Sequence, residues 1–292
     1  MSTGRSRIGH AIQETVADPV RAVRIAVKYG IGVLVSLWML FPIYWMFTNS
    51  FRTNEAIQNW PPKFIFFDPT LAHWEELFVE NGFHQFLFNS AFISITVVVL
   101  SLFLAIPAAY SLSRLDVPAD RHISFYILST RMVPPLAILV PLYVFYQYVG
   151  LTNSRVGLII AHFLLTLPLM IWIIKGFIDE IPESLEESAM VDGCNRIEAF
   201  RAVILPLIMP GVAAAAFIGL IFSWNDFQLA LVLLSGADRT APLVIQSAMG
   251  YLEIDYGLLG AAGTITVLPV VIISLLIRDY LVEGMTMGAV KE

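Results

Sequence analysis

The sequence has little charge and almost no cysteine, and each scarcity excludes a class of protein. Only 14% of its 292 residues are charged, against about 25% in soluble domains, so the chain lacks the polar surface that a water-facing enzyme of this length needs. A single cysteine, Cys194, excludes a disulfide framework and a multi-cysteine zinc or iron–sulfur site. The five histidines form no H-x-x-x-H pair, and we expect no metal site. A net charge of −6 disfavours a nucleic-acid partner.

Apolar residues are abundant instead, at 58% of the chain, and the mean hydropathy is +0.76. A helix of about 20 apolar residues crosses the hydrocarbon core of a bilayer. We predict an all-α integral membrane protein with a cytoplasmic tail over 1–28, a six-span domain over 29–282 and a second cytoplasmic tail over 283–292. The predicted spans are 29–47, 86–112, 123–149, 156–174, 207–234 and 256–277. Prolines inside the spans predict kinks, because neighbouring helices can satisfy the carbonyl groups that proline leaves unpaired.

Basic residues predict the orientation, because loops on the cytoplasmic side carry an excess of Lys and Arg. They are concentrated in both tails and in the connections that follow the second and fourth spans. The opposite side holds only four: Arg52, Lys63, Arg155 and Arg239. Both termini are therefore expected in the cytoplasm.

The cytoplasmic loop over 179–206 carries the most specific pattern in the chain. Ser184-x-x-Glu187 fits a capping box at the start of a first short helix. Gly193 would end that helix in a left-handed conformation, and Asn195 would open a second helix. Taken alone, this helix–turn–helix pattern is equally compatible with an ordinary interfacial helix, because a short lone helix is marginal in water and must dock against something.

The same residues resemble a known family. Glu187-Ser188-Ala189, Gly193 and, nine residues later, Val203-Ile204-Leu205-Pro206 are similar to the E-A-A-x3-G-x9-I-x-L-P loop of ATP-binding-cassette (ABC) importer permeases. Ser188 replaces an alanine and Val203 an isoleucine, and both changes are small. The resemblance extends over most of the chain from about residue 25.

Further segments resemble the carbohydrate, maltose-type branch of that family. These are Arg131-Met132-Val133-Pro134-Pro135, Ser223-Trp224-Asn225-Asp226-Phe227 and the tail Gly284-x-Thr286-x-Gly288-Ala289-Val290-Lys291. The chain ends in Glu292 where glycine is usual in the family. The sequence is therefore identified as similar to a type I ABC importer permease that carries a sugar, a polyol or a sugar derivative, with no finer choice of substrate.

The resemblance implies a set of partners. A second homologous permease pairs with this one, two cytoplasmic ATPase subunits bind ATP and Mg, and an extracytoplasmic solute-binding protein delivers the sugar. This agrees with the absence of a phosphate-binding G-x4-G-K-[ST] motif from the chain, which is not expected to be an enzyme or to bind a cofactor itself. The implied location is the cytoplasmic (inner) membrane of a bacterium or archaeon.

The resemblance also implies which residues touch the ATPases. The expected docking residues are Glu186, Glu187, Ser188, Ala189, Met190, Asp192, Gly193, Leu205 and Pro206. The tail residues Gly288, Ala289, Val290 and Lys291 would contact the ATPases as well, and the alternative for them is a frayed terminus.

The fifth predicted span contains a mixture of aromatic, amide and carboxylate groups that suits a sugar path. The candidates are Trp224, Asn225, Asp226 and Gln228. Asp226 is equally compatible with an interfacial carboxylate in contact with water, and in the maltose-type system the partner permease holds most of the sugar. Arg131 can snorkel to the interface, and His162 fits a hydrogen-bonded histidine inside the bundle.

The outer segments 50–85 and 235–255 are candidates for contact with the binding protein. By resemblance, the loop before the last span reaches into that protein, and here the loop contains Tyr251, Glu253 and Asp255. The alternative for this segment is a solvated loop.

Three other classes compete with an importer subunit. An ion-coupled secondary transporter needs two gated halves and ion sites near the bilayer midplane, for which six spans with one peripheral carboxylate give little support. A channel needs a filter-like loop or a charged ring, and none is visible. An intramembrane hydrolase needs an H-E-x-x-H pair or paired aspartates within the spans, and the sequence has neither.

Overall fold

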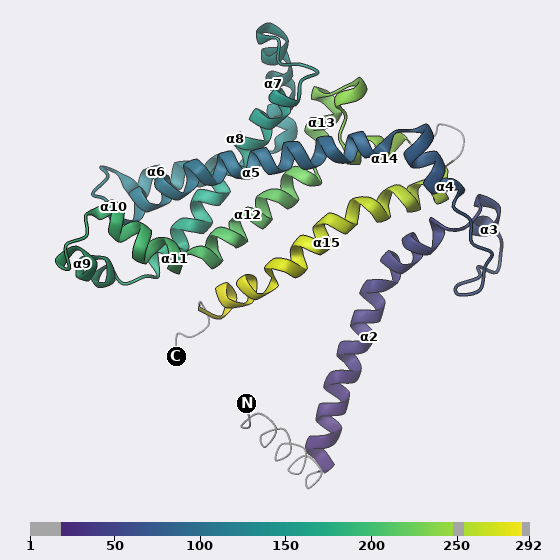
Figure 1. Ribbon diagram of the computed structural model, residues 1–292, viewed down its shortest axis with the longest axis horizontal. Coiled ribbons are helices and arrows are strands. Elements are labelled where there is room, and N and C mark those ends of the chain that lie inside the picture. Colours follow the sequence, from purple (N-terminus) through teal and green to yellow (C-terminus); the bar gives the residue numbers. More distant parts are fainter. Residues whose placement is uncertain (1–18, 248–253, 288–292) are drawn as a thin grey trace.

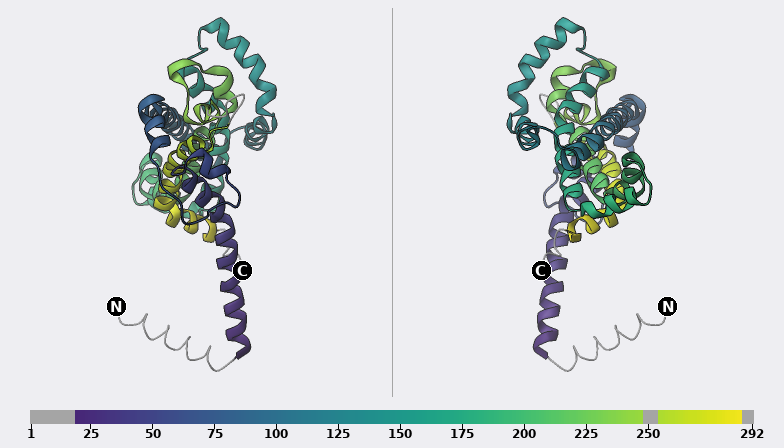
Figure 2. Two further views of the ribbon diagram at one scale, coloured as in Figure 1. Left: turned by 90° about the vertical axis from the view of Figure 1, so that its right-hand side faces the viewer. Right: turned by 90° about the vertical axis from the view of Figure 1, so that its left-hand side faces the viewer.

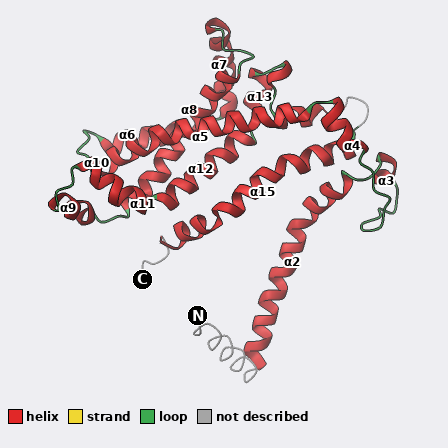
Figure 3. Ribbon diagram, viewed as in Figure 1, coloured by secondary structure: helices red, strands yellow, loops and turns green. Residues whose placement is uncertain are grey.

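The computed structural model describes residues 19–247 and 254–287, and these form helices joined by loops (Figures 1 and 3). The long helices are α2 (Pro19–Asn49), α5 (Phe83–Arg114), α7 (Pro135–Val149), α8 (Arg155–Asp179), α12 (Met209–Trp224) and α15 (Tyr256–Met287). Shorter helices connect them: α3 (Asn54–Gln58), α4 (Ala72–Glu75), η1 (Glu76–Glu80), α6 (Asp120–Ser129), η2 (Thr130–Met132), α9 (Glu183–Val191), α10 (Arg196–Ala199), η3 (Phe200–Ile204), α11 (Leu205–Leu207), α13 (Gln228–Leu233), η4 (Gly236–Asp238) and α14 (Ala241–Ser247).

Among the described residues, four helices, α2, α5, α8 and α15, contain stretches that are long and apolar enough to cross a membrane. Two further segments reach that length only as bent pairs, which brings the candidate spans to between four and six. The all-helical membrane class predicted from the sequence is confirmed. The helices run on through Pro42, Pro107, Pro168 and Pro269, as expected of prolines in spans.

The third predicted span, 123–149, differs from a single kinked helix. It consists of α6 with η2 and then α7, and the two parts meet at 88°. Val133 and Pro134 at the break have ψ of 123° and 131°. A residue that precedes proline is pushed out of the helical region. Here Val133 precedes Pro134 and Pro134 precedes Pro135, so two successive residues are extended and the helix breaks. Figure 2 shows α7 projecting from the remaining helices.

The fifth predicted span, 207–234, is also divided. The helix that ends at Leu207 meets α12 at 69° around Ile208. Pro210 contributes to this break because it has no N–H group to donate back along the helix. At the other end, α12 stops at Trp224 and a separate helix, α13, begins at Gln228.

The core lies where α5, α8 and α12 pack together (Figure 1). Buried aliphatic side chains fill it, among them Ala105, Met170, Ile174, Ile208 and Ala215. Small residues permit the close approach of α12 to α8. A Cβ atom on Gly211 would lie 2.3 Å from the Phe177 ring, and one on Gly219 would lie 2.0 Å from the Met170 methyl group. Close packing at small residues is the usual way in which membrane helices associate.

Helix α2 stands apart from this core. No residue in the most apolar part of Val23–Asn49 is buried by the rest of the chain. Near its C-terminal end the Met46 side chain and carbonyl lie against Gly260 and Gly263 of α15. The apolar surface of α2 must therefore be covered by lipid or by another protein chain.

Candidate functional site

The loop over 179–206, which the sequence predicts to be cytoplasmic, forms the expected helix–turn–helix. The first helix, α9, ends at Val191, and Gly193 follows with φ +100°. The Gly193 N–H group donates to the Met190 carbonyl (3.1 Å), and the Cys194 N–H group donates to the Ala189 carbonyl (3.1 Å). These two bonds are those of a Schellman motif, in which glycine supplies the left-handed residue. The prediction that Gly193 ends the first helix in a left-handed conformation is confirmed.

The start of α9 differs from the prediction. Helix α9 begins at Glu183 after Pro182, so Ser184 lies inside the first turn and no side chain caps this end. Pro182 is the N-cap residue, with φ −58° and ψ 132°, and the helix therefore starts one residue ahead of Ser184. The capping box lies instead at the second helix, where Asn195 accepts from the Glu198 N–H group (3.0 Å) and Glu198 accepts from the Asn195 N–H group (2.8 Å).

Glu186 does not face outward as a docking residue would. It is only 4% exposed. Its carboxylate accepts a hydrogen bond from the Tyr110 hydroxyl and lies 3.5 Å from the Arg114 guanidinium. Arg114 also donates to the Ile178 carbonyl (2.9 Å) at the end of α8. A buried carboxylate needs such partners, and these partners attach α9 to the ends of α5 and α8.

The opposite face of α9 is free within the described part of the chain. Glu187 and Ser188 are exposed, as are Asp192 and Gly193 in the turn, whereas Ala189 and Met190 are half-buried. Val191 is 87% exposed and was not among the residues expected to dock. An apolar residue two positions before the helix-ending glycine of an acidic loop is the sequence signal that could have revealed it. At the far end of the loop Leu205 is half-buried and Pro206 exposed.

A second feature is a cavity of about 710 Å³ beside the break before α7 and the junction between α12 and α13. Residues from the start of α7, the middle of α8 and the α12–α13 junction line it. Among the predicted sugar-path residues it includes Asn225, Asp226 and Gln228. The cavity is also lined by polar side chains that were not predicted to form the sugar path, namely Arg131, His162, Thr166 and Ser223. The Phe222 and Phe227 rings complete this part of the wall.

Asp226 is the centre of the polar network in this cavity. Its carboxylate lies 3.1 Å from His162 Nε2 and accepts from the Ala230 N–H group (3.0 Å), so it also caps α13. His162 Nδ1 lies 2.8 Å from the Ser223 hydroxyl. The histidine is thus hydrogen-bonded inside the bundle, as one interpretation of the sequence expected. It is also part of the cavity wall, which sequence spacing alone could not reveal.

Arg131 and Trp224 have different positions from those that the sequence suggested. Arg131 does not snorkel away: it donates to the Leu165 carbonyl (2.6 Å), and its guanidinium lies 5.0 Å from the centre of the Phe222 ring in the cavity wall. Trp224 is buried, and its indole N–H donates to the Thr266 carbonyl of α15 (3.2 Å). Trp224 therefore joins α12 to α15 and does not line the cavity.

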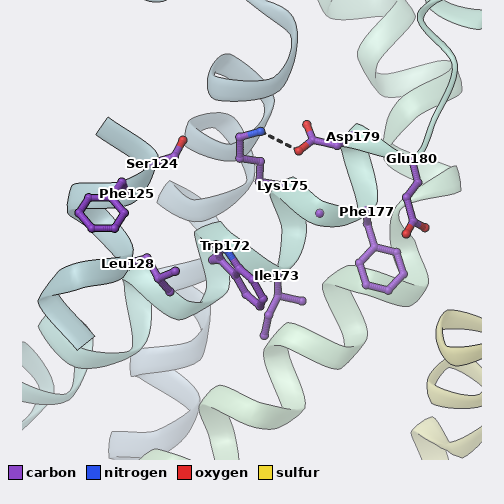
Figure 4. A pocket seen from close by; sticks show the side chains of 10 residues that line it. Ser124, Phe125, Leu128, Trp172, Ile173, Lys175, Phe177, Asp179 and Glu180 are labelled. Carbon is purple, nitrogen blue, oxygen red and sulfur yellow. Dashed lines mark hydrogen bonds and ion pairs between the residues drawn. The ribbon is translucent and has the colours of Figure 1, made fainter. Parts of the chain in front are cut away.

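Another cavity of about 580 Å³ lies between α6 and the end of α8 (Figure 4). Its wall includes the exposed Phe125 and Trp172 rings. The ion pair between Lys175 and Asp179 (2.7 Å) spans one side of it. This groove therefore combines exposed aromatic rings with charged side chains.

Several predicted contact residues lie outside the described parts of the chain. These are Tyr251 and Glu253 of the outer loop and Gly288, Ala289, Val290 and Lys291 of the tail. Asp255 is described, and it caps the first turn of α15 by accepting from the Leu258 N–H group (2.8 Å).

Together these features define a helical membrane protein in which a short helix, α9, is held against the ends of two membrane helices. Comparisons with known proteins agree with this class. Residues 97–287 match the family described as "Binding-protein-dependent transport system inner membrane component", and the chain belongs to this family. It is thus a multi-pass inner-membrane subunit of an ABC transporter and not an enzyme, and the ion-coupled alternative is set aside.

Curated relatives and a solved structure resemble the chain over nearly all of its length. It is 32% identical to the diacetylchitobiose uptake system permease protein DasC of Streptomyces coelicolor, with 89% of this chain and 95% of the relative covered. It is also 32% identical to the trehalose transport system permease protein SugB of Mycobacterium tuberculosis, with 89% and 96% covered. A bacterial ABC transporter chain involved in alginate import has the same fold, with TM-score 0.75, 24% identity and 91% and 98% covered.

Proposed function

We propose that this chain is one of two permease subunits of an ATP-driven importer of a sugar or sugar derivative. It forms half of the translocation path, pairs with a second homologous permease, and docks through α9 against one of two cytoplasmic ATPases. Those ATPases bind ATP and Mg, and an extracytoplasmic solute-binding protein delivers the sugar. Both termini lie in the cytoplasm of a bacterium or archaeon.

The mounting of α9 is the observation that carries this proposal. One face of α9 is fixed to the membrane helices through Glu186, Tyr110 and Arg114. The other face offers Glu187 and Val191 to the cytoplasm. A helix held in this way moves as a rigid piece, so movement of a docked ATPase is transmitted to α5 and α8. Val191 supplies the apolar contact, and Glu187 supplies a charge for a basic residue of the ATPase.

Exposed apolar surfaces on the membrane helices support pairing with a second permease. Helix α2 buries none of its most apolar part within this chain. The groove between α6 and α8 exposes the Phe125 and Trp172 rings. A second permease would cover surfaces of this kind by close helix packing.

The polar cavity supports a sugar as the substrate. Relatives named for the uptake of diacetylchitobiose and trehalose share the whole permease region with this chain. Sugars are recognised by aromatic rings against their apolar faces and by amides or carboxylates at their hydroxyl groups. The cavity combines both in Phe227, Asn225, Asp226 and Gln228.

The experiment is the purification of the full chain from its native membrane in a mild detergent, with identification of co-purified proteins by mass spectrometry. We expect the unmodified chain to retain an ATPase and a second permease. Glu187→Lys should lose most of the ATPase, at least tenfold, because the docking face would then present the wrong charge.

Glu180→Lys is the matched control. It reverses an exposed charge at the end of α8, a few residues before the docking helix, and should retain the ATPase. Equal retention of the ATPase by Glu187→Lys and the unmodified chain would contradict docking through α9. Recovery of the chain with no nucleotide-binding partner would contradict the importer itself.

A further inference from the structure

A cluster of three metal-ligating side chains lies on the outer side of the bundle, away from both features described above. His73 on α4, Glu76 at the start of η1 and Asp255 before α15 each point one ligand atom into the same space, and these atoms all lie within 4.8 Å of one another. His73 and Glu76 are three residues apart on one helical stretch and so share a face. Asp255 comes from the far end of the chain.

The hydrogen bonding of His73 determines which of its ring nitrogens is free. Its Nε2 lies 2.9 Å from the Arg52 carbonyl oxygen. A carbonyl oxygen can only accept, so Nε2 carries the hydrogen and donates it. In the neutral ring Nδ1 then bears a lone pair.

That lone pair faces other acceptors. Nδ1 lies 3.6 Å from Asp255 Oδ1. His73 is only 7% exposed, and Nδ1 has no hydrogen-bond partner within residues 19–247 and 254–287. A buried polar atom without a partner is costly, and here a lone pair and two carboxylates converge with no donor among them. A cation in this space satisfies all three groups.

Neighbouring groups orient His73 and Asp255 in the way that is usual for the ligands of a bound metal ion. A metal-binding histidine typically donates its second ring N–H to a carbonyl or a carboxylate, as His73 does to Arg52. The Leu258 N–H group orients the Asp255 carboxylate by donating to Oδ1 (2.8 Å). A Cβ atom on Gly257 would lie 2.0 Å from His73 Nε2, so only glycine allows the ring to rest on the first turn of α15.

The negative charge of the cluster and its access to solvent also favour the binding of a cation. Burial, together with the nearby Asp255 and Glu80 carboxylates, raises the pKa of Glu76 above its ordinary value. The site thus concentrates negative charge that a cation would offset. Glu76 and Asp255 are half-exposed, so an ion can enter from solvent.

We propose that His73, Glu76 and Asp255 bind one divalent transition-metal cation that joins the outer helices α4 and η1 to the start of α15. One nitrogen and two carboxylate oxygens suit Zn²⁺, whose bonds to them are about 2.0–2.2 Å long. One ion can therefore bridge the 3.6 Å between Nδ1 and Oδ1. Water from the exposed side completes the coordination. This site departs from the absence of metal expected from the sequence.

The test uses Zn²⁺ as the probe and the full chain purified in detergent through a tag without histidine, because a polyhistidine tag itself binds zinc. After the chain is stripped with a chelator, zinc binding is measured by competition with a zinc-sensitive dye, and the melting temperature is measured with and without zinc. We expect about one ion per chain and a higher melting temperature with zinc.

Two variants remove ligands with little other change. His73→Gln keeps a donor for the Arg52 carbonyl and loses Nδ1, and Glu76→Gln changes a half-exposed side chain. Each should weaken zinc binding at least tenfold and abolish the zinc-dependent rise in melting temperature. His84→Gln removes an exposed histidine nearby on α5 and should change neither quantity.

Two results would overturn the proposal. One is the absence of saturable zinc binding, or equal binding by the unmodified chain and both ligand variants. The other is a melting temperature of the unmodified chain that is the same in zinc and in chelator.

Discussion

Glu186 and Glu187 are neighbours in the sequence and have opposite surroundings. Glu186 is buried against Tyr110 and Arg114, whereas Glu187 is exposed. Successive side chains on an α-helix are rotated by about 100°. This rotation is enough to move the side chain from the face of α9 that packs on α5 to the exposed face. The two carboxylates therefore have separable effects, one on folding and one on docking.

We expect Glu186→Ala to destabilise the folded chain by about 3 kcal/mol, because the buried Arg114 side chain loses its buried carboxylate partner and keeps the exposed Glu183 carboxylate at 3.9 Å. The free energy of unfolding in detergent measures this change. Glu187→Ala is the matched control, and it should alter the stability by less than about 0.5 kcal/mol because the side chain is exposed. Similar stability of the two variants would show that the contact of Glu186 with α5 contributes little.

At the scale of the helices, glycines determine how closely α12 approaches α8. The space beside Gly211 is filled by the Phe177 ring and that beside Gly219 by Met170. The apolar runs predicted that these segments are helices in the membrane. They could not predict which glycines face another helix, because both faces of such a run are apolar.

We expect Gly211→Leu to destabilise the chain by about 1–3 kcal/mol, since the added side chain collides with the Phe177 ring. Gly176→Leu on α8 is the control, because a Cβ atom there meets nothing within 4 Å. Thermal unfolding of both variants in the same detergent checks this expectation. An equal loss at Gly176 would attribute the effect to leucine itself and not to the helix contact.

At the scale of the whole molecule, the polar cavity depends on segments that are far apart in the chain. Arg131 comes from the break before α7, His162 from α8 and Asp226 from the break after α12. The two breaks let the backbone turn aside and leave room between the helices. A continuous helix in either place would fill that space with its own side chains.

We expect Asp226→Asn to lower the maximal rate of sugar uptake at least tenfold while the folded protein persists in the membrane. Asparagine can still cap α13 through its Oδ1 atom, but the negative charge beside His162 is lost. Asp279→Asn is the control, because that carboxylate is exposed and pairs with Arg278 outside the cavity. Unchanged uptake by Asp226→Asn would place the sugar path elsewhere.

The sequence by itself determined the membrane class, the helical fold and the helix–turn–helix form of the loop over 179–206. It could do so because each depends on local pattern: long apolar runs, a positive φ at Gly193, and the spacing of the E-A-A-like motif. It also identified Asn225, Asp226 and Gln228 as candidates, since polar groups in an apolar run stand out.

Only the tertiary structure decided which groups meet. It brought His162 to Asp226 and Arg131 into the same cavity wall, and it turned Trp224 toward α15. It also buried Glu186 against Arg114 and placed His73 beside Asp255. These pairings join residues that are distant in the chain or depend on the exact rotation of a helix. Their geometry follows from side-chain packing between helices, and no local pattern in one sequence records it.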